Sequence, residues 1–178
     1  FDEVLQVTER PDGDVEGGLW DFAQGYAQLR EGHADFAEVY LNRVRHTAET
    51  SEAQMRFHTA DTLLGTVAGI LEGEVHRQRG EFDEAVAAFQ RAVELEDSLV
   101  YDEPEPLPFA ARHWLGAILL ELERYAEAER VYRDEIIDHP HNGWSLFGLK
   151  SAVEAQERTD AAIDSDLDRS WARSDTWL

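Results

Sequence analysis

Apolar residues recur along most of this chain at the three- and four-residue intervals of amphipathic helices. Ile163, Leu167 and Trp171, for example, form a narrow apolar stripe with charged neighbours, as expected of a helix that covers the end of a stack. The pattern predicts helices at residues 19–31, 34–48, 61–79, 82–97, 108–122, 125–138, 142–156 and 159–174. Residues 1–7 are predicted to form the last helix of a preceding unit, and residues 10–18, rich in glycine, a loop.

Small residues recur at a fixed spacing inside these helices. A glycine is followed twelve residues later by an alanine, and four residues after that by a large apolar residue. The three sets are Gly25, Ala37 and Leu41, then Gly73, Ala85 and Phe89, then Gly116, Ala128 and Tyr132. Small residues let two helices approach closely, and the bulky residue fills the groove beside that contact. Gly32 and Gly80 fall midway, where a left-handed residue closes a helix. Each set therefore predicts a helical hairpin that needs neighbours to bury its apolar face.

Two links between these hairpins are longer than the third. Residues 50–58 lengthen the first link, and residues 100–108, which contain three prolines, lengthen the second. Prolines at this density cannot lie inside a helix, so an extended or turn segment is predicted there. Asp102 and Glu103 in this segment could bind a cation or a basic peptide, or could simply be solvated. Long insertions often carry function, although plain linkers are more common.

The repeated residues resemble the tetratricopeptide repeat family, whose 34-residue pattern is W-x2-L-G-x2-Y, then A-x3-F, then P. The third unit is the most similar, with Leu115, Gly116, Ala128, Tyr132 and Pro140 in register. Other units depart from the pattern, and in the fourth unit Asp160 stands where alanine is expected. The resemblance covers about residues 19–178. Residues 71–106 and 142–149 more narrowly resemble the C-terminal part of long, uncharacterised bacterial repeat proteins.

The resemblance implies an all-α fold, a right-handed superhelical solenoid of about four antiparallel helix pairs. The predicted units are residues 19–48, 61–97, 108–138 and 142–174, in one domain from residue 19 to residue 178, preceded by a helix remnant and loop at 1–18. Members of this family bind proteins or peptides in a concave groove lined by the first helix of each pair. No catalysis is implied.

Positions beside the motif glycines line that groove in the family. Carried over to this chain, the predicted peptide-binding residues are Phe22, Tyr26, Ile70, Glu74, Arg77, His113, Ser145 and Leu149, together with Ala117. This groove would be aromatic at one end, charged in the middle, and small or apolar at the other. Some family members hold the C-terminal carboxylate of chaperones with Lys, Arg and Asn. This chain has only two asparagines, Asn42 and Asn142, and one lysine, Lys150. They do not fall at the positions of that set, so a chaperone C-terminus is not an expected partner.

Acidic residues dominate the composition. Asp and Glu number 38 against 16 Lys and Arg, which gives a formal net charge of −22. Such a charge repels phosphate backbones and anionic lipids, so neither nucleic acid nor membrane is an expected partner. The acidic surface is compatible with plain solubility or with adaptation to high salt. The scarcity of lysine fits the second explanation, although a GC-rich genome would also favour arginine.

We expect the thermal midpoint of unfolding to rise with KCl from millimolar to molar concentration. Exposed like charges repel one another, and salt screens that repulsion. A neutral salt is needed because sulfate also strengthens hydrophobic burial. Midpoints that stay flat or fall would exclude adaptation to high salt.

Candidate chemistry is sparse. His139 and His141 flank a proline that fills the family's turn position, so a structural turn is favoured over metal binding. His76 and Glu72 share one helix face, but a third zinc ligand at helical spacing is missing. His113 is expected to be a groove residue rather than a catalyst. Cysteine is absent, and neither a phosphate-binding loop nor a nucleophile elbow is found. No cofactor or metal is predicted, and the chain is not expected to be an enzyme.

The sequence therefore favours a protein- or peptide-binding scaffold, and a basic partner is the one expected. One alternative is a structural spacer or self-association module of a longer protein, with homodimers formed through open repeat ends. Another is that catalysis lies upstream and this segment positions a substrate. The chain begins with Phe1 and reads as a piece of a longer protein; a cytoplasmic location is predicted, since no signal peptide or membrane-spanning run is present.

Overall fold

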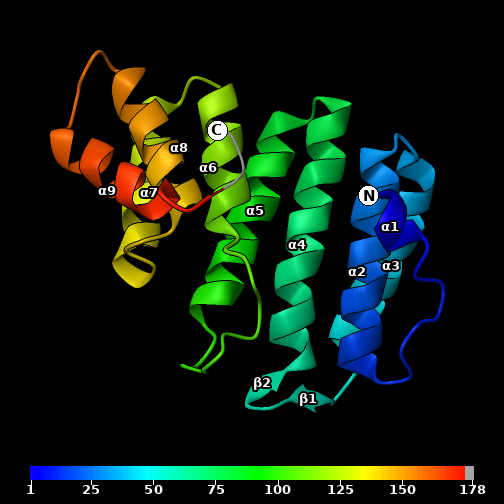
Figure 1. Cartoon of the computed structure of the whole chain (residues 1–178). Coiled ribbons are helices and arrows are strands. Elements are labelled where there is room, and N and C mark those ends of the chain that lie inside the picture. The colour runs from blue at the N-terminus through cyan, green and yellow to red at the C-terminus, as the bar shows by residue number, and fades with distance from the viewer. Residues whose placement is uncertain (175–178) are drawn as a thin grey trace. The chain divides into compact units, whose positions relative to one another are not determined.

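The computed structural model describes residues 1–174, and within them the elements are helices apart from one short hairpin (Figure 1). The helices are α1 Asp2–Leu5, α2 Asp14–Arg30, α3 Ala34–Thr50, α4 Ala60–Arg79, α5 Phe82–Asp97, α6 Arg112–Glu121, α7 Tyr125–Asp138, α8 Gly143–Glu154 and α9 Ala161–Trp171. The strands are β1 Gln54–Met55 and β2 His58–Thr59. The all-α class is thus confirmed, whereas the handedness of the superhelix stays a prediction. The last residues of the predicted domain, 175–178, lie outside the described part.

The chain divides into two compact units, Phe1–Ala111 and Arg112 onward. In the first unit, α2, α3, α4 and α5 stand side by side as two antiparallel pairs (Figure 1). In the second unit, α7 packs against both α6 and α8, and α9 packs on α8. The predicted domain boundary between residues 18 and 19 falls inside α2.

The loop predicted at residues 10–18 was wrong in its second half, because α2 already begins at Asp14. Gly17 and Gly18 lie inside α2 and allow neighbouring side chains to approach its backbone closely, rather than breaking the helix. An added Cβ at Gly18 would lie 2.5 Å from a methyl group of Leu64 on α4, and one at Gly17 would lie 2.3 Å from the Arg10 guanidinium. The two glycines therefore let neighbouring groups reach the α2 backbone.

The opening segment, residues 1–10, is fastened along α2 by side chains of that helix. Gln24 donates from Nε2 to the carbonyls of Val4 at 2.7 Å and Val7 at 3.0 Å. The Trp20 indole also donates to the Val7 carbonyl, at 3.0 Å. The Val4 carbonyl also accepts from the Val7 amide, at 3.1 Å, and the Val7 carbonyl lies beyond the four-residue helix. The hydrogen bonds from Gln24 and Trp20 place α1 against α2. The sequence predicted residues 1–7 as the last helix of a preceding unit.

The glycine contact of the second pair has the predicted register, whereas in the first pair Gly25 meets Tyr40 and Leu71 rather than the predicted Leu41. A Cβ at Gly73 would lie 2.4 Å from the Phe89 ring, which is fully buried. A Cβ at Gly25 would lie 2.8 Å from the Tyr40 Cβ and 3.5 Å from the Ala37 carbonyl. The turns also agree, since Gly32 and Gly80 have φ values of 85° and 74°. A residue without Cβ adopts this conformation without strain.

The two insertions take different forms. The first contains the antiparallel hairpin β1–β2, in which Met55 pairs with His58; the sequence analysis did not predict it. The second stays irregular as far as Ala111, so the helix predicted from residue 108 starts four residues later, at Arg112. Pro106 and Pro108 explain the delay, because proline restricts the residue before it to extended conformations.

Tyr132 organises the second unit. Added Cβ atoms at Gly116 on α6 and Gly148 on α8 would lie 2.3 Å and 2.2 Å from its ring, so the two glycines hold one tyrosine between two helices. The fourth pair does not follow the register of the others. Asp160 accepts a hydrogen bond from the Ala162 amide and is the N-cap of α9, which explains why alanine is absent there.

Candidate functional site

In the first unit, the residues predicted to line the groove lie on α2 and α4, and they differ in exposure. Ile70 is fully buried, while Phe22 and Glu74 keep less than a tenth of their surface exposed. Tyr26 and Arg77 are half-buried. The Arg77 guanidinium donates to a carboxylate oxygen of Glu74 at 3.1 Å. Only Tyr26 and Arg77 of this group therefore offer a partner appreciable side-chain surface, and their role in binding stays a prediction.

Aromatic rings of the chain itself pack against Phe22 and Tyr26. The Phe1 ring centroid lies 5.9 Å from that of Tyr26, and the Phe109 centroid lies 6.0 Å from that of Phe22. The Arg30 guanidinium in turn lies 5.9 Å from the Phe1 centroid. Phe1 belongs to the opening segment and Phe109 to the end of the second insertion. Both contacts were missed because no periodic pattern reports where irregular segments pack.

In the second unit, the predicted set gives a buried polar contact rather than an open surface. The side chains of Ser145 and Leu149 have no solvent exposure. His113 on α6 has its Nε2 2.9 Å from the Ser145 hydroxyl on α8. A serine next to a histidine is the arrangement of a nucleophile and its base, but a serine without solvent exposure cannot be reached by a substrate. The contact is therefore best explained as packing between α6 and α8.

The charge state of this buried region is set by its surroundings. Burial, together with the charge of His139, lowers the pKa of His113 to about 4. Glu135 on α7 is also buried, and its carboxylate lies 2.6 Å from His139 Nδ1. Burial raises the pKa of Glu135, although the charges of His139 and Arg112 act in the opposite direction. His139, predicted as part of a structural turn, is thus the partner of a buried carboxyl group.

We expect His113 to make the folded chain lose stability as the pH falls from 6.5 to 4. In this window the unfolded chain protonates its histidine while the folded chain does not, so the unfolded state binds more protons. The loss attributable to His113 is roughly 1–3 kcal/mol. Urea unfolding at a series of pH values should show it in the parent and not in His113→Gln. Glu135→Gln is the control with opposite sign, because a raised carboxyl pKa costs stability as the pH rises. Identical pH profiles for parent and His113→Gln would contradict this expectation.

Glu72, considered as a zinc ligand with His76, is engaged by arginines instead. Its carboxylate lies 2.5 Å from the Arg45 guanidinium on α3 and 3.1 Å from that of Arg91 on α5. Burial acts to raise the pKa of Glu72, but the two arginines outweigh it and hold the pKa below its usual value. Nδ1 of His76 lies 2.6 Å from Glu81. Among residues 1–174, no group of three or more His, Asp or Glu side chains is placed to hold a metal ion.

These ion pairs line a cavity of about 240 Å³ between α3 and α4. Its lining is mixed in charge: Glu38, Leu41, Asn42, Arg45, Glu72, Val75, His76 and Arg79. Arg79 pairs with Glu38 across the opening, so both arginines of the lining already have carboxylate partners. The arrangement favours a network that joins α3 to α4 over an anion site.

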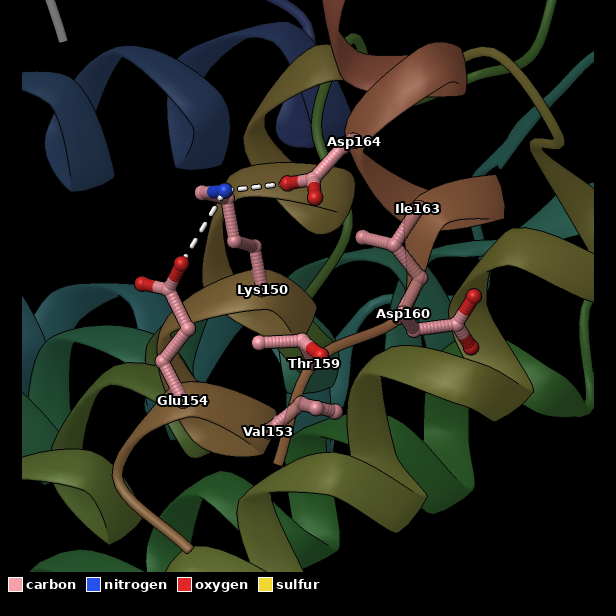
Figure 2. A pocket seen from close by; sticks show the side chains of 7 residues that line it. All are labelled: Lys150, Val153, Glu154, Thr159, Asp160, Ile163 and Asp164. Atoms are coloured by element: carbon pink, nitrogen blue, oxygen red, sulfur yellow. Dashed lines mark hydrogen bonds and ion pairs between the residues drawn. The ribbon is translucent and has the colours of Figure 1, made fainter. Parts of the chain in front are cut away.

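The lysine of this chain, Lys150, closes a small pocket between α8 and α9 (Figure 2). Its ammonium group lies between Glu154, at 3.0 Å, and Asp164, and both point toward it in Figure 2. Hydrogen bonds to Asp164 and Glu154 raise the pKa of Lys150. The enclosed volume is about 10 Å³, enough for one water molecule. The ion pair between Lys150 and Asp164 thus holds α9 against α8.

The most concentrated set of contacts that the sequence analysis missed joins the two insertions. Asp102 is buried, with Oδ2 3.2 Å from His58 Nε2 and Oδ1 paired with the Arg56 guanidinium. Arg56 also donates to the carbonyls of Pro104 at 2.9 Å and Glu103 at 2.8 Å. Asp102 was considered only as a cation or peptide ligand. No local signal could have shown that its partners lie more than forty residues earlier.

The comparison with known families agrees with this architecture. Residues 70–143, from the middle of α4 to the start of α8, match a family model described as tetratricopeptide repeat. Over these residues the chain is similar to tetratricopeptide repeats. The matched segment contains most of the second predicted unit and all of the third, including Gly73 with Phe89 and Gly116 with Tyr132. No curated protein matches the chain, and its likeness to long bacterial repeat proteins stays a prediction.

Tetratricopeptide repeats generally act as scaffolds for protein–protein interaction and are typically not catalytic. Within residues 1–174, no helix is both long and apolar enough to cross a membrane.

Proposed function

We propose that this chain is a scaffold that binds a basic peptide segment of another protein, without catalysis of its own. The observation that supports it best is the pair of half-buried side chains, Tyr26 and Arg77, on the adjacent first helices α2 and α4. Both helices are held in place by the glycine contacts of their own hairpins, so these side chains sit on a rigid support. A rigid support reduces the entropy lost on binding.

The expected chemistry of the partner follows from charge. A chain with a formal net charge of −22 attracts cations and speeds their encounter. The phenol ring of Tyr26 offers a surface on which an apolar or cationic side chain can rest. Glu74 is buried beside Arg77, so it adds a negative charge under this face rather than a direct contact with the ligand.

Peptides selected from a random-peptide library on the immobilised parent chain provide the ligands for a test. We expect Tyr26→Ala to raise the off-rate of selected peptides, because anchors act after encounter. Glu74→Gln should lower the on-rate and make it less dependent on salt.

Glu84→Gln is the matched control, since it removes the same charge from an exposed position on α5. It should leave both rates nearly unchanged. If every selected peptide binds Tyr26→Ala and Glu74→Gln as it binds the parent, this face of α2 and α4 is not the binding site.

A further inference from the structure

The two insertions lengthen this chain at one end of the first unit, and they are fastened to each other. The hairpin supplies Arg56 and His58, and the proline-rich segment supplies Asp102 and the carbonyls of Glu103 and Pro104. Asp102 Oδ1 also accepts a hydrogen bond from the Glu103 amide, at 3.0 Å. Each oxygen of this buried carboxylate is thus engaged. Buried, satisfied polar networks of this kind fix one arrangement of the groups that they join.

Arg56 holds this arrangement from a strained backbone position. Its φ is 58°, in the left-handed region that residues other than glycine rarely adopt. Such a conformation is unfavourable and persists where the surroundings stabilise it. The three acceptors that the guanidinium reaches on the second insertion offset this cost. The strain gives a reason to look for a function next to the contact.

Three apolar side chains beside this contact are left in solvent. Phe57, between Arg56 and His58, is 70% exposed; Tyr101, next to Asp102, is 82% exposed; and Val100 is 56% exposed. We call these three residues the insertion platform. Aromatic side chains fixed on a rigid base carry much of the energy in protein interfaces, because little side-chain entropy remains to be lost.

The opposite end of the same insertion is buried. The insertion as a whole is therefore packed on the unit, and only its first part is exposed. Leu107, Ala110 and Ala111 are buried, and the Ala111 amide donates to the Glu96 carboxylate at 2.9 Å. Phe109 packs near Phe22 on α2. One segment therefore holds one aromatic residue, Phe109, half-buried against the unit and leaves another, Tyr101, in solvent.

Charge indicates the partner. Residues 96–106 contain five carboxylates and no Lys or Arg. Arg56, the nearest basic residue in the hairpin, is already directed at Asp102 and its neighbours. The Tyr101 hydroxyl is hydrogen-bonded to the Glu103 carboxylate, which raises the pKa of Tyr101. An aromatic ring with a carboxylate at its edge is suited to a guanidinium or ammonium group, which can stack on the ring and pair with the acid.

We propose that the insertion platform is a second docking surface, for a basic peptide segment that carries an apolar side chain next to Arg or Lys. The apolar side chain contacts Phe57 and Val100, while the cation lies over Tyr101 against Glu103. This surface is separate from the face of α2 and α4, and its existence does not depend on peptide binding there.

The test compares two parallel selections from one random-peptide library, on the parent chain and on the Phe57→Ser/Tyr101→Ser double variant. We expect the parent to enrich peptides with adjacent basic and apolar residues that bind the double variant at least about tenfold more weakly. All three side chains are exposed, so the thermal midpoint of the double variant should equal that of the parent. Phe36→Ser is the matched control, because Phe36 is a 61% exposed aromatic residue on α3.

The possible outcomes separate the two sites. Peptides that lose affinity with the double variant but keep it with Tyr26→Ala and Phe36→Ser support the insertion platform. If all enriched peptides bind the double variant as tightly as the parent, or if those that depend on it are acidic, the proposal is overturned. Peptides sensitive to Tyr26→Ala alone would support the face of α2 and α4, and the platform is overturned if every enriched peptide behaves in this way.

Arg56→Gln tests whether the platform must be held in place. The variant makes the surface more acidic, so charge alone predicts tighter binding of basic peptides. If the contact with Asp102 orders the rings, binding should instead weaken severalfold. Tighter binding would overturn the proposed geometry.

Discussion

Phe89→Ala should lower the free energy of unfolding by roughly 3–5 kcal/mol. The ring of Phe89 is fully buried, and it fills the space over Gly73 where α4 and α5 meet. Removing it deletes the apolar surface that both helices bury and leaves a cavity that a helix pair cannot close without shifting. Urea unfolding followed by circular dichroism measures the loss.

A double-mutant cycle makes this expectation specific to the glycine contact. Gly73→Ala alone should cost roughly 1–3 kcal/mol, although alanine favours helix over glycine, because its Cβ would lie 2.4 Å from a Phe89 ring carbon. In the Phe89→Ala background the same methyl group enters empty space. The double variant should therefore lose less stability than the sum of the two single losses, by roughly 0.5–3 kcal/mol.

Gly65→Ala is the matched control in the same helix. Its Cβ would meet only a terminal methyl group of Leu95, at 2.9 Å, which can move aside. The change should be neutral or slightly stabilising, since alanine favours helix by roughly 1 kcal/mol over glycine. Strict additivity between Gly73→Ala and Phe89→Ala would show that the assigned contact does not limit the approach of α4 and α5.

Arg10→Met is expected to cost roughly 1–3 kcal/mol, because it removes the hydrogen-bonded partner of a buried carboxylate. Asp21 on α2 has no solvent exposure, and its Oδ2 accepts from Arg10 Nε at 2.9 Å. The nearest other cation, Arg43, lies 3.6 Å from Oδ1, beyond a direct hydrogen bond. Methionine keeps much of the aliphatic stem, so the loss reports the stranded carboxylate rather than lost packing.

Asp21→Asn tests whether the loss in Arg10→Met comes from the buried charge of Asp21 or from the loss of the contact itself. It leaves Arg10 and Arg43, both of which reach solvent, and an amide that needs no counterion. Asp21→Asn should therefore be milder than Arg10→Met, and the double variant milder than Arg10→Met alone. Equal losses for all three would indicate that the charge of Asp21 is not what Arg10 compensates.

The helices of this fold were predictable from the sequence where small and large residues repeat. Gly73, Ala85 and Phe89 define a contact between two helices, and that contact is present because the repeat spacing and the helical period determine it together. The fourth pair shows the limit of such reasoning. A fixed register predicts alanine at residue 160, whereas a capping aspartate begins α9 there. The local capping signal was the better guide.

The candidate binding surface was less predictable, because exposure depends on segments far away in the sequence. Ile70 and Ser145 occupy positions that line a groove in the resembling family, yet neither reaches solvent here. Phe22 lies against Phe109, which follows an insertion that the repeat pattern does not describe. The hairpin at Arg56 lacks the glycine or asparagine that its left-handed backbone would favour. Neither feature leaves a periodic trace in the sequence.

The docking of α9 on α8 can be followed by circular dichroism. Gly143, at the start of α8, leaves room for the Trp171 ring, and Trp171 lies edge-on to Trp144 with centroids 5.0 Å apart. The contact fixes the asymmetric surroundings of both indoles, and aromatic rings held in fixed packing give a band in the near-ultraviolet circular dichroism spectrum. That band depends on one helix–helix contact, so its disappearance before the far-ultraviolet signal would report release of α9 while the other helices remain folded.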